Sequence, residues 1–270
     1  MSARRGVDAG SREGTPVRYR ARVEYDGTEF SGFQVQPGKR TVQGALEAAL
    51  AHLSGGTRQP VDGAGRTDAG VHAEGQVIAF TYSGGLDATA LGKALNGLLP
   101  PDVAIGDLRR AARGFHPRYA ARYREYRYTV WNGPRSPLRE RTALWVRTRL
   151  DTDAMARAAQ AFVGRRDYSA FGGPDPQPIR NVHDVRVRRD GHQVTIDVRA
   201  DAFLRGMVRR MVAALLGVGR GTIEETAVAA ALADRRPAFG GVAAPARGLS
   251  LRRVVMGRTS RRTRGEHEER

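Results

Sequence analysis

Hydrophobic and charged residues recur with two different periods along the first half of the chain, and each period predicts one kind of element. Between Val17 and Tyr25 every second residue is apolar, which is typical of a strand with one buried face. From Val42 to Leu53 apolar residues recur every three or four positions, which indicates a helix that Thr41 caps. In chain order the first half is predicted to contain a strand at 17–25, a helix at 42–53, strands near 58–62 and at 76–82, a helix from Asp87 to Leu99, and a strand near 103–108.

The second half of the chain repeats the same order of elements. Two alternating segments are joined by Asp190–Gly191, a dipeptide typical of a tight hairpin turn. Thr222 and Glu225 have the spacing of a capping box, which predicts an extra helix that reaches Ala233. The other elements predicted for this half are strands at 122–131, 182–189, 193–200 and 249–256 and helices at 152–163 and 203–216.

Each half therefore has the order strand, helix, strand, strand, helix, strand, which is that of the split β-α-β, ferredoxin-like unit. We expect an α+β fold in which two ferredoxin-like halves join into one large, mainly antiparallel sheet. The helices should lie on one face, with an active-site cleft between the halves. The expected boundaries are 17–113 and 114–256, with a disordered basic tail at 1–16 and a disordered charged tail at 257–270.

Composition excludes several classes of protein. Among the 270 residues there is no Cys, which excludes disulfide scaffolds, thiol nucleophiles, Fe–S clusters and Cys-ligated zinc. The net charge is +17, and every basic residue except Lys39 and Lys93 is Arg. The two expected tails carry only three of these seventeen charges, so the folded part is itself strongly basic. A surface of this kind attracts polyanions, which are RNA, DNA or an anionic membrane.

Hydrophobic runs are too short for a membrane span. A run such as Met211–Leu216 falls far short of the ~20 residues that a spanning helix needs. The N-terminus also lacks the apolar stretch of a signal peptide. We therefore expect a soluble, cytoplasmic protein with no membrane partner.

Residues 63–75 form the most unusual segment of the chain. Four glycines in thirteen residues allow tight turns and the close approach of a ligand. Among them lie a cation, Arg66, and a carboxylate, Asp68. One interpretation is a polar turn between two strands, because Asp and Gly are common turn residues. The other is a loop that carries chemistry, and both interpretations stay open at this point.

Several specific chemistries are excluded for this loop. It begins like a phosphate-binding P-loop, but Val71–His72 stand where Lys and Ser or Thr are required. His72 and Glu74 match part of a zinc deaminase motif, but that zinc also needs cysteines. The histidines of the chain do not have the spacing of a metal site, so no metal is predicted.

Residues 109–128 combine positive charge with aromatic rings. The segment holds seven Arg and one acidic residue, Glu125, and its rings include Tyr119 and Tyr126. Arg neutralises phosphates and aromatic rings stack on unpaired bases, so the segment is typical of an RNA site. The alternative is a solvated charged face with the rings in the core. The unbalanced charge favours RNA, although alternation places Tyr126 and Arg127 on opposite faces.

The predicted helix at 203–216 carries two charges in an apolar setting. Arg205 and Arg209 lie four positions apart, on one face near its start, and residues 202–223 contain no acid. A buried Arg needs a carboxylate or a phosphate, and Asp68 is a candidate partner. Alternatively, both side chains reach solvent past the apolar residues.

Residues 65–72, Gly-Arg-Thr-Asp-Ala-Gly-Val-His, resemble the signature loop of the tRNA pseudouridine synthase A family. The resemblance extends along most of residues 19–256. Further motifs occur in the family's order: Tyr25–Thr28, Gly32–Gln34, Thr41–Gln43, Phe115–Arg118, Tyr126–Tyr128 and Met207–Arg209. The chain departs from the family pattern at Arg205–Gly206, where the family more often has His or Tyr followed by His or Asn.

This resemblance implies an isomerase that converts uridine to pseudouridine at positions 38, 39 and 40 of the tRNA anticodon arm. It also implies a homodimer that uses no cofactor and no metal. The roles it implies are nucleophile for Asp68, stacking group and candidate base for Tyr126, partner of the carboxylate for Arg209, filling of the gap left by the flipped base for Arg66, and substrate binding for Arg205, His72 and Arg118.

The residues agree with such chemistry. Moving uracil between two attachment points without water needs a nucleophile that holds one fragment, and a carboxylate can do this. Three routes stay open, which are attack of Asp68 on ribose C1′, attack on uracil C6, and assistance to a glycal route. If the chain is an enzyme, Asp68, Tyr126 and Arg209 should converge in the cleft, with Arg209 within about 4 Å of Asp68.

Two other functions are weighed against this one. A non-catalytic RNA-binding protein on the same fold would explain the charge and the rings, but not a carboxylate in the middle of a basic cleft. A methyltransferase would need a nucleotide-cofactor motif after a strand, and the sequence has none.

Overall fold

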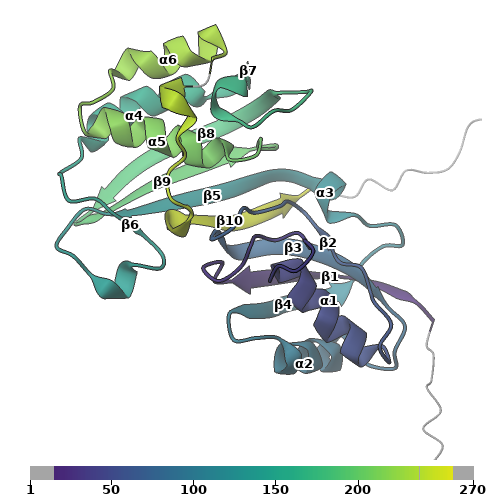
Figure 1. The fold of residues 1–270 in the computed structure, drawn as a ribbon. Helices are drawn as coiled ribbons and strands as arrows, with labels where there is room; N and C mark the ends of the chain where they lie inside the picture. Colours follow the sequence, from purple (N-terminus) through teal and green to yellow (C-terminus); the bar gives the residue numbers. More distant parts are fainter. Residues whose placement is uncertain (1–14, 237, 258–270) are drawn as a thin grey trace, which may run out of the picture.

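The computed structural model describes residues 15–236 and 238–257, which form one α+β body (Figure 1). The strands are β1 (Val17–Tyr25), β2 (Asp62–Gly63), β3 (His72–Tyr82), β4 (Val103–Arg110), β5 (Ala121–Trp131), β6 (Leu144–Trp145), β7 (Gly164–Asp167), β8 (Ile179–Asp190), β9 (Gln193–Ala200) and β10 (Leu249–Met256). The helices are α1 (Val42–Leu53), α2 (Ala88–Leu98), α3 (Pro117–Ala120), α4 (Thr152–Ala159), α5 (Met207–Gly219) and α6 (Glu225–Asp234). Most of the two predicted tails lies outside the described residues.

All ten of these strands belong to one sheet, so the expected large sheet is confirmed. Its order is β4-β1-β3-β10-β5-β9-β8-β7, with β2 on β3 and β6 on β5. The pairs are antiparallel except β3 with β10 and β5 with β6. The last strand of the chain, β10, therefore lies in the middle of the sheet, between one strand of each half.

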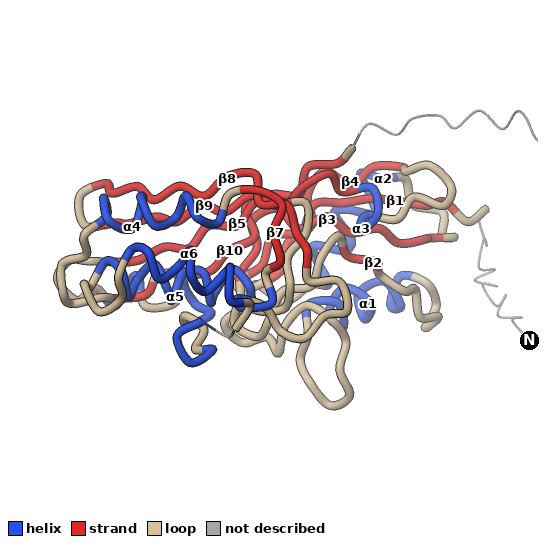
Figure 2. Tube along the Cα trace, turned by 90° about the horizontal axis from the view of Figure 1, so that it is seen from above, coloured by secondary structure: helices blue, strands red, loops and turns tan. Residues whose placement is uncertain are grey.

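One face of the sheet is buried and the other is largely exposed. In β1 the apolar residues from Tyr19 to Tyr25 are at most 3% exposed, while Arg22 and Glu24 between them are exposed. Figure 2 shows helices α1, α5 and α6 along one side of the strands, and α4 packs on β8 and on α5. The alternation of apolar and polar residues along the strand therefore indicates which face of the sheet the helices cover.

The seam between the halves is a short parallel pair. Only Ser250 with His72 and Leu251 with Ala73 are in register between β10 and β3. Beyond these pairs the strands stay in close contact, because a Cβ on Gly75 would lie 2.5 Å from the Arg252 carbonyl oxygen. Glu74 also accepts a hydrogen bond from Ser250 Oγ at 3.0 Å, and it forms an ion pair with Arg252. Side chains therefore strengthen a joint that has few main-chain hydrogen bonds.

The predicted starts of the first two helices are confirmed. The Thr41 side chain accepts a hydrogen bond from the Gly44 N–H at 3.2 Å, and Asp87 accepts one from the Ala90 N–H at 2.8 Å. The hairpin at Asp190–Gly191 also forms, and Gly191 has the positive φ, +54°, that such a turn requires.

Three predicted elements are wrong in part. The helix expected at 203–216 begins at Met207, because Gly206 takes a left-handed φ of +71° directly before it, and it runs on to Gly219. Arg205 is therefore not helical. The strand expected near 58–62 is reduced to β2, and the helix expected at 152–163 ends at Ala159 and continues as a short 3-10 turn.

The capping box expected at Thr222 is also wrong. The Thr222 hydroxyl donates to the Gly217 carbonyl at 3.0 Å, so it closes the end of α5 instead of capping α6. Glu224 precedes α6 without a side-chain cap. In the described ranges, no helix combines the length and the apolar character that crossing a membrane requires.

Candidate active site

The loop at 63–72 connects β2 to β3 and is held in place by the strand that follows it. The Ala64 N–H donates to the Val77 carbonyl at 2.8 Å. The side chain of Gln76, which is fully buried, donates to the Gly65 carbonyl at 2.9 Å. These hydrogen bonds fix the start of the loop on the rigid sheet.

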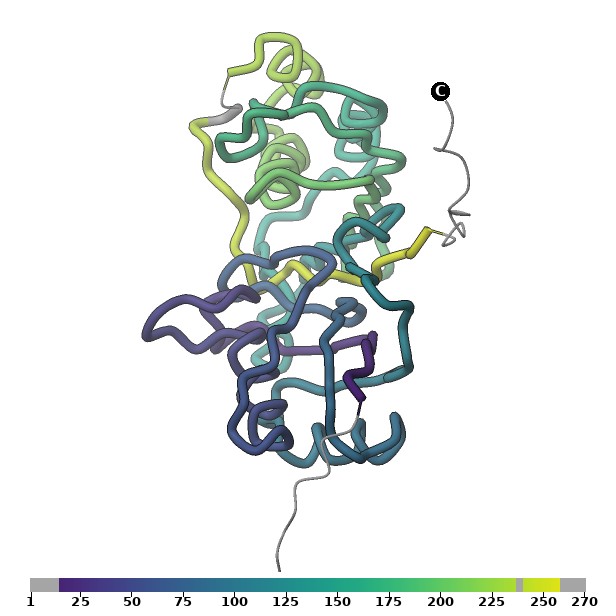
Figure 3. The backbone as a smooth tube through the Cα atoms, turned by 90° about the vertical axis from the view of Figure 1, so that its right-hand side faces the viewer, coloured from purple at the N-terminus to yellow at the C-terminus, as the bar shows by residue number. Residues whose placement is uncertain are grey.

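A second loop, between β1 and α1, packs against the first. The Phe33 N–H donates to the Thr67 carbonyl at 3.1 Å, and the Gly70 N–H donates to the Phe30 carbonyl at 3.2 Å. Two glycines make this close approach possible. A Cβ on Gly27 would lie 2.0 Å from the Val71 carbonyl oxygen, and Gly32, with φ +100°, would place one 2.9 Å from the Thr67 oxygen. In Figure 3 the tip of this second loop projects from the body of the protein.

Tyr25 holds the residue beside the carboxylate. Its hydroxyl lies 2.8 Å from Thr67 Oγ1, and its ring is buried. Burial raises the pKa of Tyr25 to about 12, although its hydrogen bonds to Thr67 and Gln76 act in the opposite direction. The phenol is therefore neutral in ordinary buffers, and the contact to Thr67 does not change with pH.

Asp68 and Arg209 meet, as expected. Arg209 Nη1 lies 3.5 Å from Asp68 Oδ2, and the two side chains are 23% and 36% exposed. The Arg209 side chain also donates from Nε to the Ala244 carbonyl at 2.7 Å, while the Ala244 N–H donates to the Arg209 carbonyl. Arg209 is thus fixed by its own segment and does not need the carboxylate to hold it.

The Asp68 carboxylate is held by charge more than by hydrogen bonds. Within the part of the chain that the structure describes, no hydrogen bond to its oxygens meets ordinary geometric limits, and the 3.5 Å contact is an ion pair only. Lone pairs of an ionised carboxylate are then available to a substrate atom, which is what nucleophilic catalysis needs.

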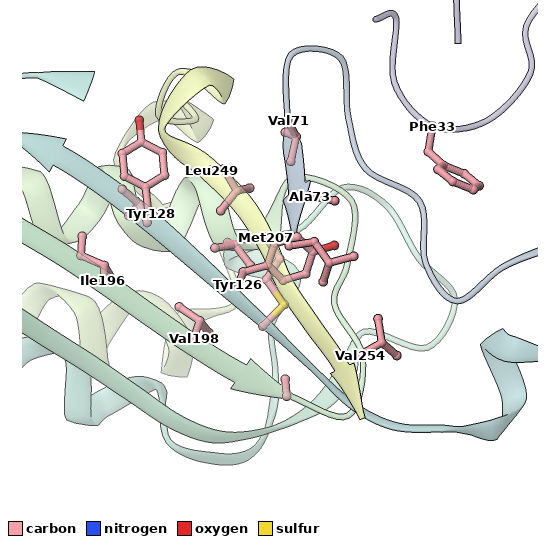
Figure 4. Packing of buried hydrophobic residues seen from close by; sticks show 14 of the residues in the cluster. Phe33, Val71, Ala73, Tyr126, Tyr128, Ile196, Val198, Met207, Leu249 and Val254 are labelled. Atoms are coloured by element: carbon pink, nitrogen blue, oxygen red, sulfur yellow. The ribbon is translucent and has the colours of Figure 1, made fainter. Parts of the chain in front are cut away.

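Tyr126 forms the floor beside this pair. Its ring is only 8% exposed and makes an edge-to-face contact with Phe203, with ring centroids 5.2 Å apart. Figure 4 shows it among Met207, Leu249 and the start of β3. Burial is the main cause that raises the pKa of Tyr126 above its ordinary value, so the phenol stays protonated at neutral pH.

These residues line a cleft of about 890 Å³ between the two halves of the chain. Its walls come from the segments 31–36, 61–71, 116–126, 175–180 and 202–210. A space of this size falls within the usual range of small-molecule and nucleotide sites. The expected cleft between the halves is therefore present, and Asp68, Tyr126 and Arg209 all line it.

The lining of the cleft is strongly basic. The cations are Arg66, Arg118, Arg124, Arg180, Arg205, Arg209 and Arg210, and the carboxylates are Asp62, Asp68 and Asp175. Each carboxylate already has an Arg partner: Arg18 lies 2.5 Å from Asp62, Arg180 lies 3.2 Å from Asp175, and Arg209 pairs with Asp68. Five lining Arg residues, at 66, 118, 124, 205 and 210, have no carboxylate within 4.0 Å in the described ranges. A cleft whose lining has this excess of positive charge favours an anionic ligand.

The other predicted binding residues have different positions. Arg66, Arg118 and Arg205 line the cleft and are exposed, so each can reach a ligand. His72 cannot, and the prediction that it binds substrate is not supported by its position. Its ring is 8% exposed, its Nδ1 accepts from the Gly27 N–H at 3.0 Å, and its Nε2 lies 2.9 Å from the Arg141 carbonyl. With both nitrogens engaged, His72 joins β3 to neighbouring loops.

The basic segment at 109–128 contributes less to the cleft than its composition suggests. Of its seven Arg, only Arg118 and Arg124 line the cleft. Arg127 lies on the opposite face of β5, where it makes a two-pronged contact with Asp197 at 2.7 and 2.9 Å. Arg124 was not among the predicted site residues, although strand alternation places it on the same face as Tyr126 and could have identified it.

Arg124 joins three segments at the edge of the cleft. Its guanidinium donates to the carbonyls of Asp201, Ala64 and Arg118 at 2.6, 2.7 and 2.9 Å. Burial is the main cause that lowers the pKa of Arg124 below its ordinary value. The charge is therefore partly desolvated and neutralised only by carbonyl dipoles, as in a site that receives an anion.

Residues that could hold a metal do not gather in the cleft. Over residues 15–236 and 238–257, the structure contains no group of three or more His, Asp or Glu side chains suitable for an ion.

The sequence of this chain is similar to those of several known proteins. A family model described as tRNA pseudouridine synthase matches residues 21–120 and 158–255. A tRNA pseudouridine synthase A from Pelobacter propionicus is 44% identical over 233 residues, which is 85% of this chain and 95% of that protein. Proteins of the same description from Geobacter sulfurreducens and Myxococcus xanthus are 41% and 42% identical, and they cover 86% and 88% of this chain and 96% and 91% of their own lengths.

Similarity to solved structures is weaker. A crystal structure of the archaeal box H/ACA sRNP Nop10-Cbf5 complex aligns with a TM-score of 0.32 and 14% identity, covering 73% of this chain and 44% of that one. A Cbf5-Nop10-Gar1 complex aligns with a TM-score of 0.31 and 13% identity, covering 73% of this chain and 54% of that one. These scores are too low to support any inference about this chain.

Proposed function

Because this chain belongs to the tRNA pseudouridine synthase family, we propose that Asp68 is the nucleophile with which it attacks a uridine held in the cleft. The chain is an isomerase that acts on tRNA, and the uridines of the anticodon stem-loop are its substrates. We propose that these substrates are the uridines at positions 38, 39 and 40 of the tRNA. The observation that carries it is a carboxylate with available lone pairs at the centre of an Arg-lined cleft.

The chemistry requires that one bond is exchanged for another. The bond between ribose C1′ and uracil N1 breaks, uracil turns, and C5 bonds to C1′, while the C5 proton leaves and N1 gains a proton. No water is consumed. An ionised carboxylate can hold C1′ or C6 covalently during the turn, or assist a glycal route, and each of these routes uses the same Asp68 oxygens.

Arg209 acts through the carboxylate. Its charge, 3.5 Å from Asp68 Oδ2, orients the carboxylate without consuming its lone pairs. The hydrogen bond from Arg209 Nε to the Ala244 carbonyl holds the guanidinium in place before substrate arrives, so no ordering cost is added during the reaction.

Tyr126 is proposed to stack on the uracil ring. Its buried, fixed ring gives an aromatic face for a base that turns in place. Its raised pKa argues against the second role considered for it, because a general base works best with a pKa near the working pH. Removal of the C5 proton is therefore not assigned to Tyr126.

The exposed Arg side chains of the cleft are proposed to receive the RNA. Arg66, two residues before the nucleophile, fills the gap that the flipped nucleotide leaves. Arg118 and Arg205 bind backbone phosphates from the other walls. A cation inserted into the helix offsets part of the cost of unstacking a base, which is a few kcal/mol.

The domain organisation, the cellular location and the oligomeric state are also part of the proposal. Each half is proposed to be a ferredoxin-like unit, with the boundary at 113 and 114. The orders β4-β1-β3-β2 and β10-β5-β9-β8 support this. Each is the fourth, first, third and second strand of its half, once the short strands β6 and β7 of the second half are left out. The protein is further proposed to act in the cytoplasm, where tRNA is, and as a homodimer.

An Asp68→Asn variant tests the nucleophile. With an unmodified anticodon stem-loop, pseudouridine formation should fall at least about 1,000-fold, which corresponds to about 4 kcal/mol of barrier, while RNA affinity stays the same or rises. Asp184→Asn is the matched control, because Asp184 is also ion-paired with an Arg, Arg186 at 2.8 Å, but does not line the cleft. Activity within about tenfold of the original would reduce Asp68 to a turn residue. Full binding with no activity in the original chain would favour a non-catalytic RNA-binding protein.

A further inference from the structure

An exposed aromatic ring lies next to residues that line the cleft. Tyr119, on the four-residue helix α3, is 80% exposed, whereas Trp145, another exposed aromatic residue in the described ranges, is 37% exposed. On the same segment, His116 and Arg118 line the cleft. A tyrosine this exposed contributes little to the hydrophobic core, and the roles assigned above do not use it.

We propose that Tyr119 is a stacking platform for an unpaired base of the anticodon loop, next to the base that enters the cleft. The platform rests on the proposed function, because it assumes that a flipped uridine occupies the space beside Asp68. It adds a second point at which the enzyme holds the loop, outside the reaction site.

A neighbouring ring holds the Tyr119 ring in place. The His116 ring packs against it at 4.7 Å between centroids, tilted by 43°. His116 Nδ1 accepts a hydrogen bond from the Arg118 N–H at 3.2 Å, which fixes the start of the helical turn. A ring that is already ordered loses little conformational freedom when a base stacks on it.

The short helix that carries the ring is itself anchored. Pro117 is buried, and the Arg118 carbonyl accepts from Arg124 at 2.9 Å. The Ala120 carbonyl accepts from the Gly257 N–H at 2.8 Å. The platform is therefore preformed, next to residues of the cleft lining, and is not the tip of a long loop.

The charge around Tyr119 selects the kind of partner. Arg118 directly precedes Tyr119 and is exposed. Arg124 donates to the Arg118 carbonyl and has no carboxylate partner in the described part of the chain. An aromatic face beside cations fits a nucleic acid whose bases are unstacked, because base faces are accessible only in single strands. The loop of an anticodon arm supplies such bases directly next to a helical stem.

The test is a double-mutant cycle between the protein and the RNA. Binding of the anticodon stem-loop is measured for the original chain and for Y119A, Y119L and Y119F, with a series of stem-loops that each lack one loop base. Y119A and Y119L should weaken binding of the intact stem-loop about 5- to 150-fold, the range for loss of one aromatic–base stack, while Y119F should stay within about twofold. Leu138→Ala serves as control, because Leu138 is 96% exposed and does not line the cleft.

The abasic series identifies the base. At one loop position, removing the base should weaken binding to the original chain by the same factor as Y119A, and it should cost Y119A nothing more. Equal affinity of Y119A and the original chain for every stem-loop would overturn the platform, as would an equal loss at every abasic position. Pseudouridine formation by the original chain, measured on the same RNA, tests the proposed function separately. If that activity is present and Y119A binds normally, only the platform fails.

Discussion

The strongest quantitative prediction concerns the salt dependence of RNA binding. Five Arg residues line the cleft without a carboxylate partner among the described residues, and each can neutralise one phosphate. If all five do so, the logarithm of the affinity should fall with the logarithm of the salt concentration with a slope of about −3.5 to −4.5, from 0.7 to 0.9 per phosphate. Between 50 and 200 mM salt the affinity should therefore drop about 100- to 500-fold.

Single substitutions divide this slope among residues. Arg118→Ala and Arg205→Ala should each make the slope shallower by about 0.7 to 0.9, and the double variant by about twice that. Both side chains are exposed, so their loss should leave the melting temperature unchanged. Arg188→Ala is the control, since Arg188 is exposed on β8 and does not line the cleft. Its slope should match that of the original chain.

The assay is fluorescence anisotropy of a labelled anticodon stem-loop over a range of salt concentrations. A slope shallower than about −1.5 for the original chain would mean that the cleft is not the main phosphate-binding surface. An equal change for Arg188→Ala and Arg118→Ala would refute the assignment of the charge to the cleft, even if the total slope is steep.

Three further outcomes follow from contacts described above. Tyr126→Phe should retain most activity and show no change in its pH–rate profile between pH 6 and 9, because burial already keeps the phenol protonated there. Tyr126→Ala should lose activity at least about 100-fold. If Tyr126→Phe changes the alkaline side of the pH–rate profile, the ionised Tyr126 side chain acts as a base after all. Arg209→Met should lower kcat by about 100-fold or more with little effect on KM. Arg209→Lys should recover only part of this loss, because Lys lacks the two separate nitrogens with which Arg209 contacts Ala244 and Asp68. An effect on KM alone would make Arg209 a phosphate contact. Gly27→Ala should lower the free energy of unfolding by at least about 2 kcal/mol, measured by chemical denaturation, because its Cβ would lie 2.0 Å from the Val71 carbonyl oxygen. Gly85→Ala is the control, since there is open space around its Cβ. Equal stability of the two variants would contradict this account.

Periodicity and turn chemistry predicted most of the sheet. The strand at 17–25 and the helix at 42–53 occur with the bounds expected, because their patterns are local and tertiary contacts reinforce them. The start of α5 could not be predicted this way. Residues 203–205 continue the apolar pattern, but Gly206 takes a left-handed conformation that no hydrophobic period reveals.

The candidate site shows the same division. The pairing of Asp68 with Arg209 could be anticipated, since an Arg in an apolar segment needs an anion and the Gly-rich loop offers one. The burial of His72 could not, because it depends on carbonyls of two distant loops, at Arg141 and Arg247. Long-range contacts of this kind leave no mark in the residues near His72.

The central position of β10 has a consequence for the making of the protein. Its neighbours β3 and β5 are complete more than 110 residues before β10 is reached, and β3 more than 160 before it. At about 5–20 residues per second, a ribosome leaves the facing edge of β3 only partly covered, by β2, for roughly 10–30 s. An open strand edge is prone to pairing with other chains, so this interval is the period of greatest aggregation risk. The sheet runs unbroken from one half to the other only once β10 inserts between β3 and β5, so a nascent chain without β10 should have no complete RNA site.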